Sequence, residues 1–266
     1  MIPVTYVAKN CKQPKGGFIK PSSLDIIQLD DGKVLSENEN VNASNIGMTV
    51  DYLTRYLLGE DIKTAFNPSL SGALNASEIE DPSIIDLAFA SVESIDKNFK
   101  KTGKLEWFDI ASACQLTAFD VWLRNPSYAK RKLVSSTSIR PNRETIENIR
   151  IMVDRGVSLF DTYGPITASG FDFEGAYTES ITSGDGDYLT KNTLWDFKVS
   201  KSKPTSKHTF QILIYWIMGQ HTGKEEFKNI DKIAIFNPRL NCIYYKKISD
   251  IPEETIRTIE EDAIGY

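Results

Sequence analysis

The sequence predicts an α/β protein, with α+β as the alternative, because two kinds of hydrophobic pattern divide the chain. Apolar residues recur with helical spacing through residues 44–157, whereas short alternating runs typical of strands follow from residue 165. The order after residue 165 is three strands, a helix, two strands and a helix. We therefore expect a sheet built in the C-terminal half, with the chemistry on that sheet.

The first half of the chain predicts a β-hairpin followed by helices. Two strand-like runs, 24–29 and 33–35, flank Asp30-Asp31-Gly32, which is a turn signal. Helical patterns then cover 44–59, a stretch opened by Asp81-Pro82, 105–123 and 143–157. We expect 1–140 to form a hairpin and helical region, either packed on the core or separate from it, and 141–266 to form that core.

The second half predicts the sheet. Strands are expected at 171–177, 187–190 and 194–199, a helix at 204–219, a hairpin with arms at 233–236 and 241–245, and a last helix from Pro252.

Composition excludes several classes of protein. The net charge is -5, so the chain is not a generally basic nucleic-acid coat, and its longest apolar run, seven residues at 212–218, is far below the ~18 of a membrane span. Three scattered cysteines and no signal-like N-terminus predict a reduced, cytoplasmic protein that has no disulfide and is not bound to a membrane. Two histidines leave little for a histidine-rich metal site.

One segment departs from this acidic balance. Residues 124–143 contain no acid and hold six cations: Arg124, Lys130, Arg131, Lys132, Arg140 and Arg143. The segment is interpreted either as a solvated basic loop or as a contact for a phosphate backbone.

The strand at 194–199 carries charge on one face. Alternation places Trp195 and Phe197 on one side and Asp196 and Lys198 on the other. If Lys191-Asn192 is a two-residue loop, Asp187 lies directly opposite Asp196, whereas a three-residue loop would misalign them.

Two facing carboxylates need a cation between them or a raised pKa. With oxygen ligands and no imidazole or thiolate nearby, the cation that suits Asp187 and Asp196 is hard, so Mg²⁺ or Mn²⁺. On the helix that follows, Gln211 and Tyr215 share one face, with His208 one turn earlier.

This combination resembles the PD-(D/E)XK nuclease superfamily. Asp187, then Asp196-Phe197-Lys198, then Gln211 and Tyr215 are similar in order and spacing to its RecB-like and lambda-exonuclease-like branch. The resemblance covers about residues 165–245, roughly a third of the chain. It implies a restriction-endonuclease-like mixed central sheet flanked by helices.

The resemblance also implies roles. Asp187, Asp196 and the Phe197 carbonyl would hold Mg²⁺ or Mn²⁺, and Lys198 would position the attacking water. In the same family, the residues matching Gln211 and Tyr215 support the site and contact the nucleic-acid backbone. Gly186 stands where the family motif has proline.

The family has a further upstream glutamate that acts at the metal. Glu174, expected on the preceding strand, is the first candidate for this catalytic and metal-binding position, with Glu147 and Glu179 behind it. The sequence does not decide among the three.

The function implied is a Mg²⁺-dependent nuclease, a hydrolase whose branch favours a DNA exonuclease. A homo-oligomer and a recombination or repair protein are the partners expected besides DNA. Two alternatives stay open: a catalytically silent nuclease-fold module that binds nucleic acid, and an unrelated small-molecule enzyme with a Mg²⁺-carboxylate site. DNA against RNA, cleavage from ends or within the strand, and polarity are also open.

Overall fold

The sheet that the sequence predicts is present in the computed structural model, which describes residues 2–132, 134–135 and 138–266. The chain divides into two compact units, which we describe separately. Unit 1 consists of Met1–Asp31 and Ser158–Tyr266, and unit 2 of Gly32–Val157. The predicted mixed α/β fold with a helical N-terminal region is confirmed.

Unit 1 contains the sheet, which has six strands within the described residues, in the order β1-β6-β5-β4-β3-β2. The strands are β1 (Asp25–Gln28), β2 (Ile166–Asp172), β3 (Asp185–Thr190), β4 (Thr193–Phe197), β5 (Lys232–Asn237) and β6 (Cys242–Lys247). Only the β4–β5 pair is parallel among these strands, and the others are antiparallel, so the sheet is mixed.

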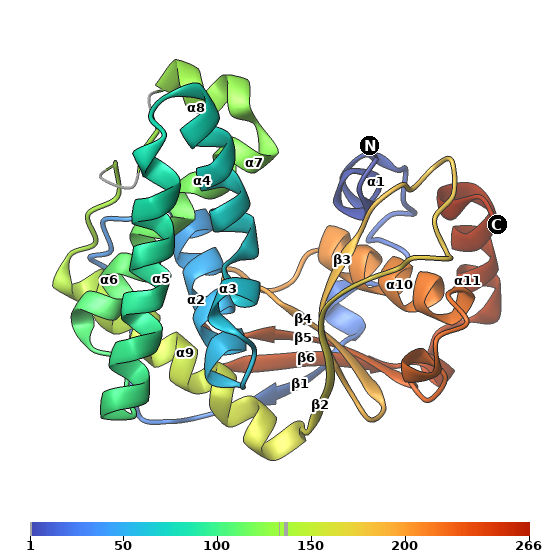
Figure 1. Cartoon of the computed structure of the whole chain (residues 1–266). Coiled ribbons are helices and arrows are strands. Elements are labelled where there is room, and N and C mark those ends of the chain that lie inside the picture. The colour runs from blue at the N-terminus through green and yellow to red at the C-terminus, as the bar shows by residue number, and fades with distance from the viewer. Residues whose placement is uncertain (1, 133, 136–137) are drawn as a thin grey trace. The chain divides into compact units, whose positions relative to one another are not determined.

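Helices cover one face of this sheet in unit 1. Helix α10 (Ser206–His221) lies over β4 and β5, α1 (Val4–Asn10) packs on α10, and α11 (Glu253–Ile259) joins the same hydrophobic core (Figure 1). The core includes Leu194 of β4 and Ile235 of β5. Burying an aliphatic side chain of this size stabilises the fold by about 2 kcal/mol.

The opposite face of the sheet is aromatic. Phe160, near the end of α9 (Arg143–Tyr163), stacks on Phe197 with ring centroids 5.8 Å apart and lies 4.8 Å from the Tyr188 ring. Trp195 donates from its indole nitrogen to Thr190 Oγ1 at 3.1 Å. Both faces around β4 are therefore packed, which holds this strand rigidly.

The predicted N-terminal hairpin is wrong. β1 pairs with β6, Asp25 opposite Tyr245, and Gln28 Nε2 donates to the Leu240 carbonyl at 3.0 Å. The second predicted arm forms no strand, and Val34 within it is 89% exposed. The predicted arm has only three residues, whereas β6 pairs with all four residues of β1.

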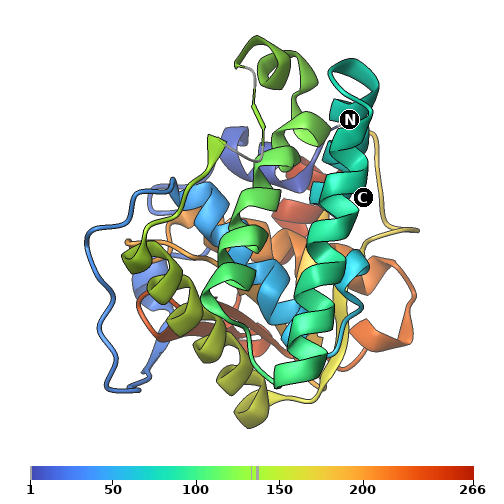
Figure 2. The same ribbon diagram turned by 60° about the vertical axis from the view of Figure 1, so that its left-hand side comes forward.

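Unit 2 is helical. Its helices are α2 (Ala43–Leu57), α3 (Ile62–Ala65), α4 (Asn67–Ile79), α5 (Ser83–Thr102), α6 (Trp107–Leu116), α7 (Asp120–Arg124), α8 (Pro126–Lys132) and the first part of α9. Helix α5 packs along α4 and α6 (Figure 2). The single helix expected at 105–123 is instead α6, a 3₁₀ turn and α7. No helix in the described ranges is both long and apolar enough to cross a bilayer.

A buried polar cluster joins α2, α4 and α7. Tyr52 Oη and Ser69 Oγ donate to the two oxygens of Asp120 at 2.5 and 2.6 Å. Burial raises the pKa of Asp120, although both hydrogen bonds oppose this rise. Gly72 of α4 lies against the 3₁₀ turn Thr117–Phe119 that precedes α7. A Cβ built at Gly72 would be 1.9 Å from the Phe119 carbonyl oxygen.

This close approach makes Gly72 a test of unit 2 packing. We expect Gly72→Ala to lower the free energy of unfolding by about 3 kcal/mol, because a methyl group cannot enter without separating α4 from the turn before α7. Chemical denaturation monitored by circular dichroism measures the change. Ser71→Ala on the same helix is the control and should stay within about 0.5 kcal/mol. Equal stability of both variants would contradict the packing described.

Candidate functional site

The β3–β4 hairpin has the register that places the two aspartates together. Tyr188 pairs with Trp195 and Leu189 with Leu194, and this register continued by one residue brings Asp187 level with Asp196, although the backbone pairing itself ends at Tyr188 and Trp195. Lys191 and Asn192 form the two-residue loop, as expected. Asn192 Nδ2 donates to Asp231 Oδ1 at 3.1 Å, which anchors a loop that lacks the usual glycine.

Asp196 is a buried carboxylate with one oxygen paired and one unpaired. Its side chain is 2% exposed, and Lys198 Nζ lies 2.6 Å from Oδ1. Its Oδ2 is buried and has no hydrogen-bond partner in the described part of the chain. An uncompensated buried charge is costly, and Lys198 supplies the compensating charge at Oδ1.

Asp187 is held in place by the backbone of β4. Its Oδ2 accepts the Phe197 N–H at 2.7 Å, where the carboxylate takes the place of a ladder partner from β3. This contact fixes the Asp187 side chain next to the strand that carries Asp196. The three residues expected to hold a metal from this hairpin, Asp187, Asp196 and Phe197, are therefore neighbours.

Gln211 and Tyr215 lie on the same face of helix α10. Gln211 Nε2 donates to Tyr215 Oη at 3.0 Å, which confirms that the two share a face. Burial raises the pKa of the Tyr215 phenol well above its ordinary value, and the charges of Asp196 and Asp187 raise it further. The phenol therefore lies in the field of both carboxylates and stays protonated.

His208 stands at the start of α10. Its Nδ1 accepts the Thr205 N–H at 3.3 Å, and the Thr205 side chain caps the His208 N–H in return. Burial lowers the pKa of His208, the positive charge of Lys198 lowers it further, and Asp196 opposes both. The capping box thus places a largely neutral imidazole in the field of Asp196 and Lys198.

Glu174 does not lie on a strand, contrary to expectation. β2 ends at Asp172, and Glu174 follows in an exposed turn, where its N–H donates to Asp172 Oδ1 at 3.1 Å. Phe173 leaves the strand and stacks on Tyr215 with centroids 5.1 Å apart, which ends the alternation on which the expectation depended. Glu179 is also exposed in the connection from β2 to β3.

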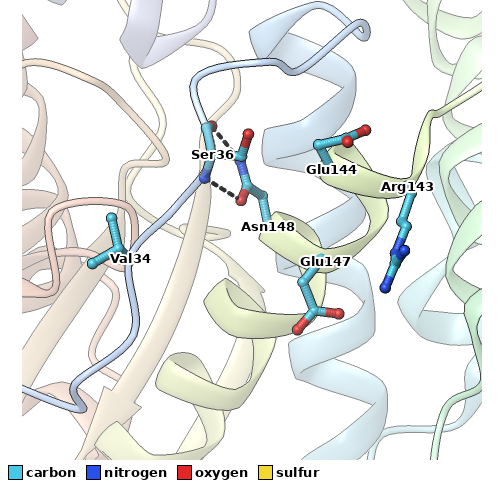
Figure 3. Close-up of a pocket in the computed structure, with 6 residues that line it drawn as sticks. All are labelled: Val34, Ser36, Arg143, Glu144, Glu147 and Asn148. Atoms are coloured by element: carbon cyan, nitrogen blue, oxygen red, sulfur yellow. Dashed lines mark hydrogen bonds between the residues drawn. The ribbon is translucent and has the colours of Figure 1, made fainter.

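Glu147 lies in unit 2, on α9, with Arg150 Nε 3.4 Å from its Oε2. It stands at a hollow of about 230 Å³ (Figure 3). The hollow is lined by Val34, Ser36, Arg143, Glu144, Glu147 and Asn148. Asn148 closes one side by exchanging two 2.8 Å hydrogen bonds with the Ser36 backbone. None of the six is one of the hairpin residues described above.

Asp185 is a carboxylate that the sequence reasoning missed. It lies on β3 two residues before Asp187, on the same strand face, and its charge also raises the pKa of Tyr215. The sequence does contain a signal for Asp185. Strand alternation places residues two positions apart on the same face, and this applies to Asp185 and Asp187 just as it applies to Asp196 and Lys198.

The donor set fits a hard divalent cation. The Asp187 carboxylate is hydrogen-bonded to the residue next to Asp196, and the buried Oδ2 of Asp196 is an acceptor without a partner in the described part of the chain. Mg²⁺ commonly uses one or two carboxylates and completes its octahedron with water and substrate phosphates. Within the described residues no three His, Cys, Asp or Glu side chains gather around one point, so the protein would contribute few side-chain ligands.

Comparisons with protein-family models, with curated proteins and with solved structures find no match for this chain.

The position of His208 can be tested by NMR, because the chain has only two histidines. We expect the pKa of His208 to lie below the ordinary 6.5 and to rise in Lys198→Gln, since a nearby positive charge is removed. Histidine ring resonances followed through a pH titration measure it, with His208→Gln for assignment. Lys191→Gln removes an exposed charge on the hairpin loop as control. An unchanged pKa of His208 in Lys198→Gln would contradict the placement of His208 near Lys198.

Proposed function

We propose that this protein is a metal-dependent nuclease that hydrolyses phosphodiester bonds. The observation that carries the proposal is the buried Asp196 carboxylate, which pairs with Lys198 through Oδ1 and has no partner at Oδ2 among the described residues, beside an Asp187 carboxylate that is hydrogen-bonded to the Phe197 N–H. Burying a carboxylate such as Asp196 beside a second, half-buried carboxylate is costly unless cations compensate the charges.

The roles proposed for the individual residues are those that the resemblance to the PD-(D/E)XK nucleases implies. Asp187 and Asp196 would hold Mg²⁺ or Mn²⁺ together with the Phe197 carbonyl, and the metal supplies Lewis acidity and a bound water of lowered pKa. Lys198, which is 23% exposed, positions the attacking water and stabilises negative charge as it develops on the phosphate. Tyr215, protonated and supported by Gln211, remains a hydrogen-bond donor.

The substrate and setting are narrower proposals. DNA as substrate and cleavage from ends follow from the resemblance to RecB-like and lambda-exonuclease-like nucleases. A homo-oligomer and a recombination or repair partner follow from the same resemblance. The three free cysteines, Cys11, Cys114 and Cys242, support a reducing cytoplasmic location. Glu174 stays a candidate for the additional glutamate, at the exposed turn after β2.

The ion pair between Asp196 and Lys198 favours a second candidate function. Because Lys198 already neutralises one oxygen of Asp196, the cluster is stable without catalysis. The protein would then be a catalytically silent nuclease-fold module that binds nucleic acid. Metal binding and cleavage separate the two functions.

Cleavage of end-labelled linear and closed circular DNA is the direct test. We expect loss of linear DNA with Mg²⁺ or Mn²⁺, no loss with EDTA, and survival of the circles. Asp196→Ala should be inactive, and Lys198→Ala should lose at least about 100-fold, because a donor to developing charge is removed. Lys191→Ala, on the loop of the same hairpin, is the matched control and should keep full activity.

Equal cleavage by wild type and Asp196→Ala would overturn the assigned site. If neither DNA nor RNA is cleaved, the silent module replaces the nuclease as the better proposal. Circular dichroism of Lys198→Ala separates a catalytic loss from unfolding, because this variant leaves Asp196 buried without its partner.

Metal binding is a separate prediction. We expect Mn²⁺ to raise the melting temperature of the wild type, because the cation compensates the charge of Asp196 only in the folded state. Asp187→Ala and Asp196→Ala should lose this rise, whereas Lys198→Ala should keep it. Differential scanning fluorimetry with and without Mn²⁺ measures it. A rise that persists in both aspartate variants would place the metal elsewhere.

A further inference from the structure

Helices α7 and α8 are adjacent in unit 2 (Figure 1), and the segment that they form carries a concentration of basic residues. We define the basic surface as Arg124, Tyr128, Lys130, Arg131 and Lys132, all of which are exposed. No acid occurs between residues 124 and 143, although the whole chain has a net charge of -5.

Three cations of this surface are unpaired in the part of the chain that the structure describes, whereas two lysines elsewhere in unit 2 form ion pairs. Lys63 pairs with Glu93 at 2.8 Å and Lys100 with Asp96 at 2.7 Å. In contrast, Lys130, Arg131 and Lys132 have no ion-pair partner among the described residues. Arg124 approaches only the buried Asp120, at 3.8 Å.

The helix alone does not account for this arrangement. Cations in the last turn of α8 interact favourably with the helix dipole, by about 0.3–1 kcal/mol each at an exposed surface. That effect ends within one turn, whereas the acid-free segment continues to residue 143. Three adjacent unpaired cations repel one another, and a polyanion relieves that repulsion.

An exposed aromatic ring lies within the same surface. Tyr128 is 42% exposed, and the Arg131 guanidinium lies 5.7 Å from its ring centroid. An exposed ring beside unpaired cations is the combination that nucleic-acid-binding proteins use, since the cations contact phosphates and the ring stacks on a base.

We propose that the basic surface of α7 and α8 binds the nucleic-acid backbone, as a contact made by residues other than the Asp187–Asp196–Lys198 cluster. The nature of the ligand rests on the proposed nuclease function. Charge complementarity and Tyr128 favour a nucleic acid over an acidic protein or an anionic membrane.

Fluorescence anisotropy with labelled 30-nucleotide DNA, single-stranded and duplex, tests this in EDTA, where no cleavage occurs. We compare wild type with a Lys130→Gln, Arg131→Gln, Lys132→Gln variant. If all three side chains contact phosphates, affinity near 0.1 M salt should fall about 100-fold, and the slope of log K against log salt should flatten by roughly 2 to 3. Tyr128→Ala should weaken single-strand binding by about tenfold.

The matched control is Lys97→Gln, Lys100→Gln, Lys101→Gln on α5, which removes the same charge from another exposed part of unit 2. This control should bind as wild type does. An unchanged affinity in the α8 variant, or an equal loss in the control, would overturn the proposal. Equally tight, α8-dependent binding to polyglutamate or to phosphatidylserine vesicles would also overturn it, because the surface would then not select nucleic acid.

The proposed nuclease activity and the proposed nucleic-acid-binding surface can be rejected independently of each other. Asp196→Ala should lose cleavage and keep binding. Loss of binding in the α8 variant of a protein that cleaves no DNA would support the surface and reject the nuclease.

Discussion

The interaction on which the rest of the site depends is the ion pair between Asp196, which is 2% exposed, and Lys198, whose Nζ lies 2.6 Å from Asp196 Oδ1. Removing either partner of such a buried pair leaves an uncompensated charge. The ion pair fixes the end of β4, the Phe197 N–H then fixes Asp187, and the two carboxylates act on Tyr215 of α10. The remaining oxygen of Asp196 is buried and has no hydrogen-bond partner among the described residues.

The aromatic side chains packed on the opposite face of the sheet hold the strand that carries this cluster in place. Phe197 alternates with Asp196 along β4, so its ring lies on the opposite face, between Phe160 of α9 and Phe236 of β5. Displacing the Asp196 backbone would require these rings to separate, and close-packed interiors resist such movement. Packing on the aromatic face therefore also fixes the β4 backbone that positions Asp196 on the opposite face.

Much of the site was predictable from the sequence because it depends on local rules. Strand alternation and a two-residue loop suffice to place Asp187 opposite Asp196, and helix spacing suffices for Gln211 and Tyr215. Non-local contacts decided the rest. The strand-like run at 24–29 has a suitable turn beside it, yet its partner is β6, and Glu174 leaves its strand because Phe173 packs on Tyr215. Short helices such as α3 and α8 carry too little periodicity to be recognised.

The pairing of β1 with β6 has a consequence for how the protein is made. Gln28 and Leu240, which are hydrogen-bonded in the finished sheet, lie 212 positions apart in the chain. On the ribosome, β1 emerges early and has no strand to pair with until almost the whole polypeptide has been synthesised. The helices of unit 2 make their contacts in the meantime, since these lie close together in sequence. The sheet edge farthest from the Asp187–Asp196 hairpin is thus closed last, after the charged cluster already has its strands.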